Sequence, residues 1–161
     1  VSKDETIMAA KNVYGAKFNT PVGRFSYPYV FERSQGRNGK EGRFEVTLLI
    51  PKSADIADLR TRMETVGKEA FGPRFQSLEK LKNPPIKDGD ALADDKKLEG
   101  KDAEYCRGHW VLRAKTGTPV SAVDATGTPI RDKDQIYGGC YGRLHVTPAS
   151  DNVDGNWGVT L

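Results

Sequence analysis

Alternation of apolar and polar side chains, in short runs that end at glycine or proline, most constrains how this chain folds. Between residues 43 and 50 every even position is apolar, whereas the odd positions begin with Arg43, Glu45 and Thr47, and Pro51 follows directly. Because successive side chains of a β-strand point to opposite faces, this run predicts a strand with one buried face.

Similar runs predict further strands along the chain. The alternation returns between residues 109 and 115 and between residues 136 and 147, and residues 157–161 also predict a strand. Residues 120–130 predict a hairpin. The aromatic stretch 14–31, which glycine and proline interrupt, predicts a broken or strongly bent strand. The chain is therefore expected to be mainly β.

One segment predicts a helix instead. Ser53 is a candidate N-cap, and Gly72 with the proline after it predicts the end of the helix. Between residues 72 and 106, proline and Asp-Gly pairs predict irregular structure, and the charge run 94–102 is expected to be a solvated loop. The apolar stripe of the helix, at spacings of three and four, consists of Ile56, Leu59, Met63, Val66 and Ala70.

These elements predict a small β-barrel with one main helix. We expect an OB-fold, a five-stranded partly open barrel with long loop insertions, over residues 13–161 after a flexible N-terminus of residues 1–12. The 161 residues, 37% of them hydrophobic, fit one core. No apolar run approaches the about 18 residues of a membrane span, and residues 1–5 lack the apolar region of a signal peptide, so an intracellular protein is expected.

Two cysteines and two histidines suggest a metal site. Two residues separate Cys106 from His109, and four separate Cys140 from His145, so four zinc ligands are conceivable. The alternation places Cys140 on the inward face and His145 on the outward face, which prevents these side chains from converging. We expect two reduced thiols and no metal.

No motif of a familiar catalytic class is present. A hydrolase that uses Asp88, Asp90, Asp94 or Asp95 stays open as a hypothesis, although aspartates beside glycine usually belong to turns. The net charge of +3 is too small to indicate nucleic-acid binding by itself, because the placement of charges matters more than their sum.

Aromatic and basic residues are interleaved in the last third of the chain. Tyr137 and Tyr141 flank glycines, and Arg143 follows two residues later. Exposed rings stack the bases of single strands, while Arg and Lys neutralise the phosphates. Either these tyrosines form such a surface or they are ordinary barrel residues. Likewise, Arg113 and Lys115 either contact phosphate or form a plain solvated face.

A polar loop adds further basic groups. Arg37 and Lys40 lie in this glycine-rich loop, and Arg43 begins the strand after it. Phe44 and Trp110 share the apolar parity of their strands, and both are therefore predicted in the core rather than at a ligand.

Four segments occur in order between Val22 and Leu161: Gly23-Arg-Phe-Ser-Tyr-Pro-Tyr-Val-Phe-Glu32, Leu49-Ile-Pro-Lys52 before a helix, Pro85-Ile-Lys-Asp-Gly-Asp90 and Tyr137-Gly-Gly-Cys-Tyr-Gly-Arg143. In their order and spacing they resemble a family of bacteriophage single-stranded DNA-binding proteins, over nearly the whole chain.

The resemblance implies an OB-fold that binds and protects single-stranded DNA, independently of sequence, in phage DNA replication, recombination or repair in the cytoplasm of the bacterial host. It implies no catalytic residue and no cofactor, so an enzyme is not expected.

Phage or host replication proteins are the other implied partners, through an acidic C-terminal tail. This chain ends in a predicted strand, and we expect a truncated form without that tail. No membrane partner is expected, and the chain should be a monomer or a weak dimer. The alternative is a non-catalytic phage protein-interaction or assembly module.

Ten residues are expected to contact DNA, the rings through bases and the cations through phosphates. They are Tyr27, Tyr29, Arg37, Lys40, Arg43, Arg113, Lys115, Tyr137, Tyr141 and Arg143.

Overall fold

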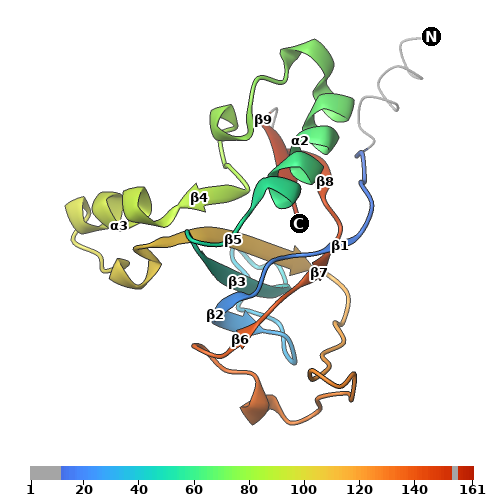
Figure 1. The fold of residues 1–161 in the computed structure, drawn as a ribbon, viewed down its shortest axis with the longest axis vertical. Coiled ribbons are helices and arrows are strands. Elements are labelled where there is room, and N and C mark those ends of the chain that lie inside the picture. Colours follow the sequence, from blue (N-terminus) through green and yellow to red (C-terminus); the bar gives the residue numbers. More distant parts are fainter. Residues whose placement is uncertain (1–11, 154–155) are drawn as a thin grey trace. The chain divides into compact units, whose positions relative to one another are not determined.

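The computed structural model describes residues 12–153 and 156–161, which group into two compact units (Figure 1). Among these residues, the first unit contains 12–20, 55–86, 145–153 and 156–161, and the second contains 21–54 and 87–144. The predicted flexible N-terminus, apart from Asn12, lies outside the described residues, as do Asp154 and Gly155.

Two short antiparallel sheets and one helix form the first unit. The sheets pair β1 (Phe18–Asn19) with β7 (His145–Val146) and β8 (Ala149–Val153) with β9 (Asn156–Thr160). The helical elements are α2 (Ala57–Phe71), η1 (Gly72–Arg74) and η2 (Leu78–Lys80). Helix α2 contacts both β8 and β9.

The predicted apolar stripe holds α2 in the core of this unit. Leu59, Met63 and Val66 are buried with Val159 of β9, as helical spacing of apolar residues requires. A Cβ on Gly15 would lie within 3 Å of Val66, so only glycine fits at this approach.

A five-stranded sheet forms the second unit, in the order β4-β5-β3-β2-β6. Its strands are β2 (Gly23–Tyr29), β3 (Phe44–Pro51), β4 (Ile86–Asp88), β5 (His109–Thr116) and β6 (Tyr141–Gly142), of which β4 begins with a residue of the first unit. β3 pairs antiparallel with β5 along its whole length and with β2 on its other side.

The even positions of β3 form the buried face, as the alternation predicts. Val46, Leu48 and Ile50 are buried and lie opposite Ala114, Leu112 and Trp110 of β5 in register. Phe44 and Trp110 lie at the ends of this face and are half-buried, whereas the alternation predicted both side chains in the core.

Helix α3 (Gly89–Leu98) and the short turn η3 (Glu104–Cys106) lie at the end of the sheet where β4 ends and β5 begins (Figure 1), and they pack against the opposite face. Leu49, Ala103 and Cys106 form a buried cluster there, with Leu92 and Val111 packed against it. Only one end of this face is therefore covered.

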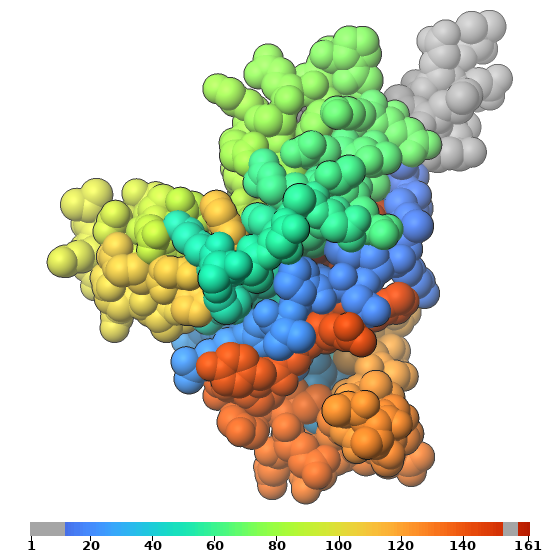
Figure 2. Space-filling model, viewed as in Figure 1, coloured from blue at the N-terminus to red at the C-terminus, as the bar shows by residue number. Residues whose placement is uncertain are grey.

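The segment between β5 and β6 contains one short turn, η4 (Lys133–Gln135), and forms a lobe that is orange in the space-filling view (Figure 2). The predicted hairpin over residues 120–130 is present as an isolated bridge between Val123 and Pro129, with a tight turn held by the Asp124 carboxylate.

Three sequence predictions need correction. The helix begins at Ala57 rather than after Ser53, because the Asp55 carboxylate accepts a hydrogen bond from the Ala57 amide at 2.9 Å. The charge run is not all loop, because α3 extends to Leu98 after Asp88 caps its start. The predicted strand 136–147 is two short strands, β6 and β7.

The architecture is mainly β, as predicted, with one long helix. Within residues 12–153 and 156–161, the strands form one five-stranded and two two-stranded sheets and no closed barrel, and the OB-fold with a partly open barrel stays a prediction. The two-stranded sheets pair residues that the alternation alone cannot assign to a partner.

Candidate nucleic-acid interface

Strand register brings aromatic and charged side chains from four strands onto one face of the second unit. Residues opposite each other in antiparallel strands point to the same side. Arg24 lies opposite Tyr141, Tyr29 opposite Glu45, and Glu45 opposite Lys115. This polar sheet face consists of Arg24, Ser26, Tyr29, Glu45, Thr47, Arg113, Lys115 and Tyr141.

A tight turn before β6 presents two tyrosines next to this face. The Gly139 amide donates to the Phe25 carbonyl at 2.7 Å, and the Phe25 amide donates to the Cys140 carbonyl at 2.8 Å. Tyr137 and Tyr141 are left 58% and 71% exposed. These exposed fractions exclude a core role for both rings and leave them free to stack.

Close packing under the turn fixes its position. A Cβ on Gly142 would lie 2.7 Å from the Phe25 ring, so a larger residue would push β6 away from β2. On the outer side, the Arg24 guanidinium donates to the Gly139 carbonyl at 3.3 Å. Arg24 is exposed beside Tyr141 and is a candidate contact that the sequence analysis missed.

The loop after β2 closes a pocket of about 340 Å³ against the strands. This basic pocket is lined by Ser34, Gln35, Gly36, Arg37, Glu41, Gly42, Arg43, Glu45, Arg113 and Lys115. It brings four of the predicted cations together with two carboxylates.

Acidic partners modify the charge of the basic pocket. Arg113 donates to the Glu45 carboxylate at 2.8 Å, and Glu45 is only 18% exposed. At the rim, Glu41 pairs with Arg33 at 3.1 Å. The exposed Arg113 guanidinium is therefore already paired with the Glu45 carboxylate. The prediction of Arg113 as a phosphate contact did not take this ion pair into account.

All ten predicted contacts lie in the second unit. Tyr29 is half-buried and the other nine are exposed. Lys40 is in the loop but does not line the basic pocket, and the pairing that orients Tyr141 ends at Gly142, before Arg143. The structure thus brings six of the ten together. Register places Tyr29, Arg113, Lys115 and Tyr141 on the polar sheet face, and Arg37 and Arg43 line the basic pocket together with Arg113 and Lys115.

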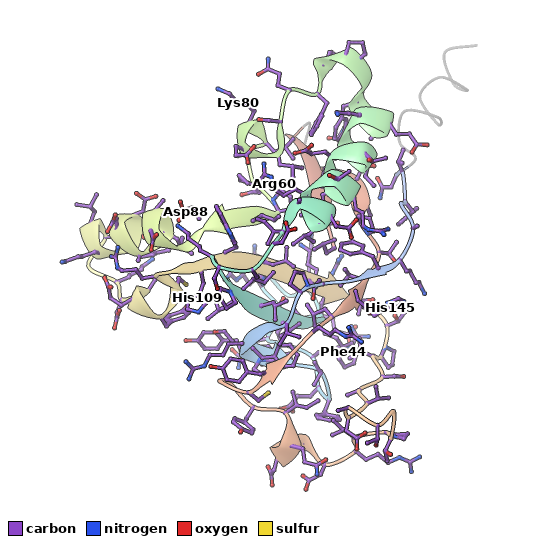
Figure 3. The ribbon with its side chains drawn as sticks, in the orientation of Figure 1. Phe44, Arg60, Lys80, Asp88, His109 and His145 are labelled. Atoms are coloured by element: carbon purple, nitrogen blue, oxygen red, sulfur yellow. The ribbon has the colours of Figure 1, made fainter. Side chains whose placement is uncertain are left out.

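The aspartates considered for catalysis are bound in a structural cluster. The Lys52 ammonium donates to Asp88 and Asp90, each at 2.6 Å, and lies 5.0 Å from the centre of the Trp110 ring. These hydrogen bonds hold the pKa of both carboxyls below the ordinary value. Asp88 also caps α3 (Figure 3), so both carboxylates fix the helix to β3 and β5.

The thiols and histidines show no metal-site geometry. Across residues 12–153 and 156–161, no group of three or more His, Cys, Asp or Glu side chains converges. Both cysteines are free, and burial raises the pKa of the Cys106 thiol. His145 instead contacts the Asn19 side chain at 3.0 Å. In the same part of the chain, no helix has the length and apolar character to cross a membrane.

Comparison with known proteins gives one family. Residues 16–161 match the model of a family described as the single-stranded DNA-binding protein of Enterobacter phage Enc34. No curated protein sequence matches the chain.

Solved structures of the Enc34 protein have the same fold. Its complex with single-stranded DNA is 23% identical, with a TM-score of 0.66 over 89% of this chain and 80% of that one. A C-terminal truncation of the Enc34 protein is also 23% identical, with a TM-score of 0.66 over 89% of this chain and 79% of that one. A further structure of the Enc34 protein is 22% identical, with a TM-score of 0.63 over 89% of this chain and 75% of that one.

Proposed function

The chain belongs to the family of the Enterobacter phage Enc34 single-stranded DNA-binding protein, and from this we propose that it binds single-stranded DNA without sequence preference. A solved relative is a complex with single-stranded DNA. The observation that carries the proposal for this chain is the polar sheet face, on which the exposed Tyr141 ring lies with the exposed cations Arg24, Arg113 and Lys115.

Phosphates bind along the cations of this face. Arg24 and Lys115 provide positive charge on two of its strands, and Arg43 and Arg37 extend this charge over the basic pocket. Each contact to a single-stranded phosphate releases about 0.7 of a counterion, so affinity falls steeply as salt rises.

Bases stack on the exposed tyrosines at the β6 side of the face. Tyr141 and Tyr137 carry rings that are more than half exposed, on a turn held by Phe25. Every base has a π-face, so stacking of this kind discriminates little among sequences. Duplex DNA keeps its bases stacked inside and offers only phosphates to this surface.

The finer aspects of the proposal follow the family. The five-stranded sheet is part of a partly open barrel of the OB type. The protein is non-catalytic, and it protects single-stranded DNA in phage replication, recombination or repair, in the host cytoplasm, with phage or host replication proteins as further partners. We take it to act as a monomer or weak dimer.

Fluorescence titration with oligo-dT at low salt tests the proposal. Binding is expected, and Lys115→Gln should weaken it and reduce the salt slope by about 0.7. Lys101→Gln removes the same charge from an exposed position outside the basic pocket, and should leave the slope unchanged. Absence of binding by the unaltered chain would refute the proposal.

A pull-down without nuclease treatment separates this function from a protein-interaction module. Under the proposal, the chain recovers nucleic acid. Recovery of a protein partner alone, with no nucleic acid, would favour the module.

A further inference from the structure

Tyr27 has a backbone conformation that its side chain disfavours. Its φ is +49°, and Asn38 is the other described non-glycine residue with positive φ. Asparagine tolerates this region, whereas a bulky ring does not, so the conformation of Tyr27 costs energy. Such strain in a folded protein is often found where a side chain has a function.

The Tyr27 ring is not buried in the core, so core packing does not explain the strained backbone of this residue. The ring is 67% exposed, and the residue lies in the irregularity between Ser26 and Tyr29 where β2 shifts register against β3. A bulge of this kind re-aims a side chain. The backbone of β2 therefore turns a large apolar ring toward solvent, next to the polar sheet face.

A second exposed tyrosine comes to the same face from another element. Tyr105 in η3 is 51% exposed, and its neighbour Cys106 is buried against Leu49. In register, Leu49 lies beside Arg24 on β2. The turn η3, which carries Tyr105, therefore packs on the face of the sheet that includes Arg24 of β2, the strand that also carries Tyr27.

Electrostatics supports the same arrangement. Partial burial raises the pKa of the Tyr105 hydroxyl, and Cys106 and Tyr27 add to the increase. Tyr27 is therefore within electrostatic range of Tyr105.

We propose that Tyr27 and Tyr105 together stack one base of bound single-stranded DNA, at a position separate from Tyr137 and Tyr141. This proposal rests on the proposed function. Arg24, beside Leu49 in the register, places a cation near the two rings for the adjoining phosphate. Rings on two elements, β2 and η3, give a base two surfaces to contact, and neither surface reads its identity.

The test compares oligo-dT with an abasic oligonucleotide of equal length, which keeps the phosphates and lacks the bases. Tyr105→Ala and Tyr27→Ala should each weaken oligo-dT binding about five- to hundredfold, the range for one stacked base. Neither should weaken binding of the abasic strand. Tyr14→Ala removes an equally exposed ring from the first unit and should change neither affinity.

Two additional measurements complete the test. Tyr105→Phe keeps the ring and should restore most of the affinity lost in Tyr105→Ala. The double variant Tyr27→Ala/Tyr105→Ala should lose less than the product of the single losses, because both rings hold one base.

The outcomes separate the two proposals. If the unaltered chain does not bind oligo-dT, the proposed function fails as well. If it binds and Tyr105→Ala, with an unchanged melting temperature, binds equally well, only the base position is refuted. Equal losses on the abasic strand, or a double variant with the full product of losses, would also overturn it. Photocrosslinking of the unaltered chain to 5-iodouracil DNA should label Tyr27 or Tyr105 if the variants fail to fold, and labelling of neither refutes the proposal.

Discussion

Glu45→Gln should make the protein bind single-stranded DNA more tightly. Glu45 accepts from Arg113 at 2.8 Å and lies opposite Lys115 in register, so its carboxylate repels a phosphate that approaches either cation. The amide removes the repulsion and frees Arg113 for a phosphate. Because the ion pair is exposed on the Arg113 side, its loss should cost the fold less than about 1 kcal/mol.

The expected magnitude follows from one added phosphate contact. One such contact releases about 0.7 of a counterion, which at about 0.1 M salt corresponds to about fivefold tighter binding. The slope of log affinity against log salt should also steepen by about 0.7. Fluorescence anisotropy with labelled oligo-dT across a salt series measures both quantities.

A matched control removes the same charge elsewhere in the second unit. Glu99 pairs with Lys96 and Lys101 and does not line the basic pocket. Glu99→Gln therefore frees cations outside the basic pocket and should leave the slope unchanged. If Glu45→Gln folds normally and binds no more tightly than the unaltered chain, the basic pocket is not where phosphates bind.

Three further predictions concern stability and stacking. Lys52→Met should lower the melting temperature at pH 7, because Asp88 and Asp90 lose the cation that lowers their pKa. The difference in melting temperature between the two proteins should shrink as the pH falls below 3.8, the ordinary pKa of these carboxyls, because they become protonated in both proteins. Leu48→Ala, at a fully buried site, should cost about 2–5 kcal/mol in chemical denaturation, and a smaller cost would show that Leu48 is not core. Tyr141→Ala should weaken oligo-dT binding with no change in melting temperature; an unfolded variant would make Tyr141 structural.

Local periodicity accounts for what the sequence predicts well. The strand of Phe44–Pro51 alternates strictly, and its buried even positions follow from that period. The apolar stripe of α2 and the glycine at its end likewise predict the helix and its C-terminus. These signals lie within the segments that they predict.

Long-range contacts account for most of the rest. Helix α3 replaces part of a predicted loop because Asp88 caps it and Lys52, 36 residues away, binds that cap. The neutralising pair of Glu45 and Arg113 joins residues 68 apart, and no local pattern specifies it. Arg24 was missed for the same reason, since only its pairing with Tyr141 shows which face it occupies.

The most direct test of single-stranded DNA binding by the polar sheet face is competition between single-stranded and duplex DNA of one length, across a salt series. Oligo-dT should displace duplex DNA at every salt concentration, because only single strands offer bases to the tyrosines. Its salt slope should be about −2.8, as expected for four phosphate contacts at Arg24, Arg37, Arg43 and Lys115. Equal competition by the duplex, or binding that salt does not affect, would contradict this account.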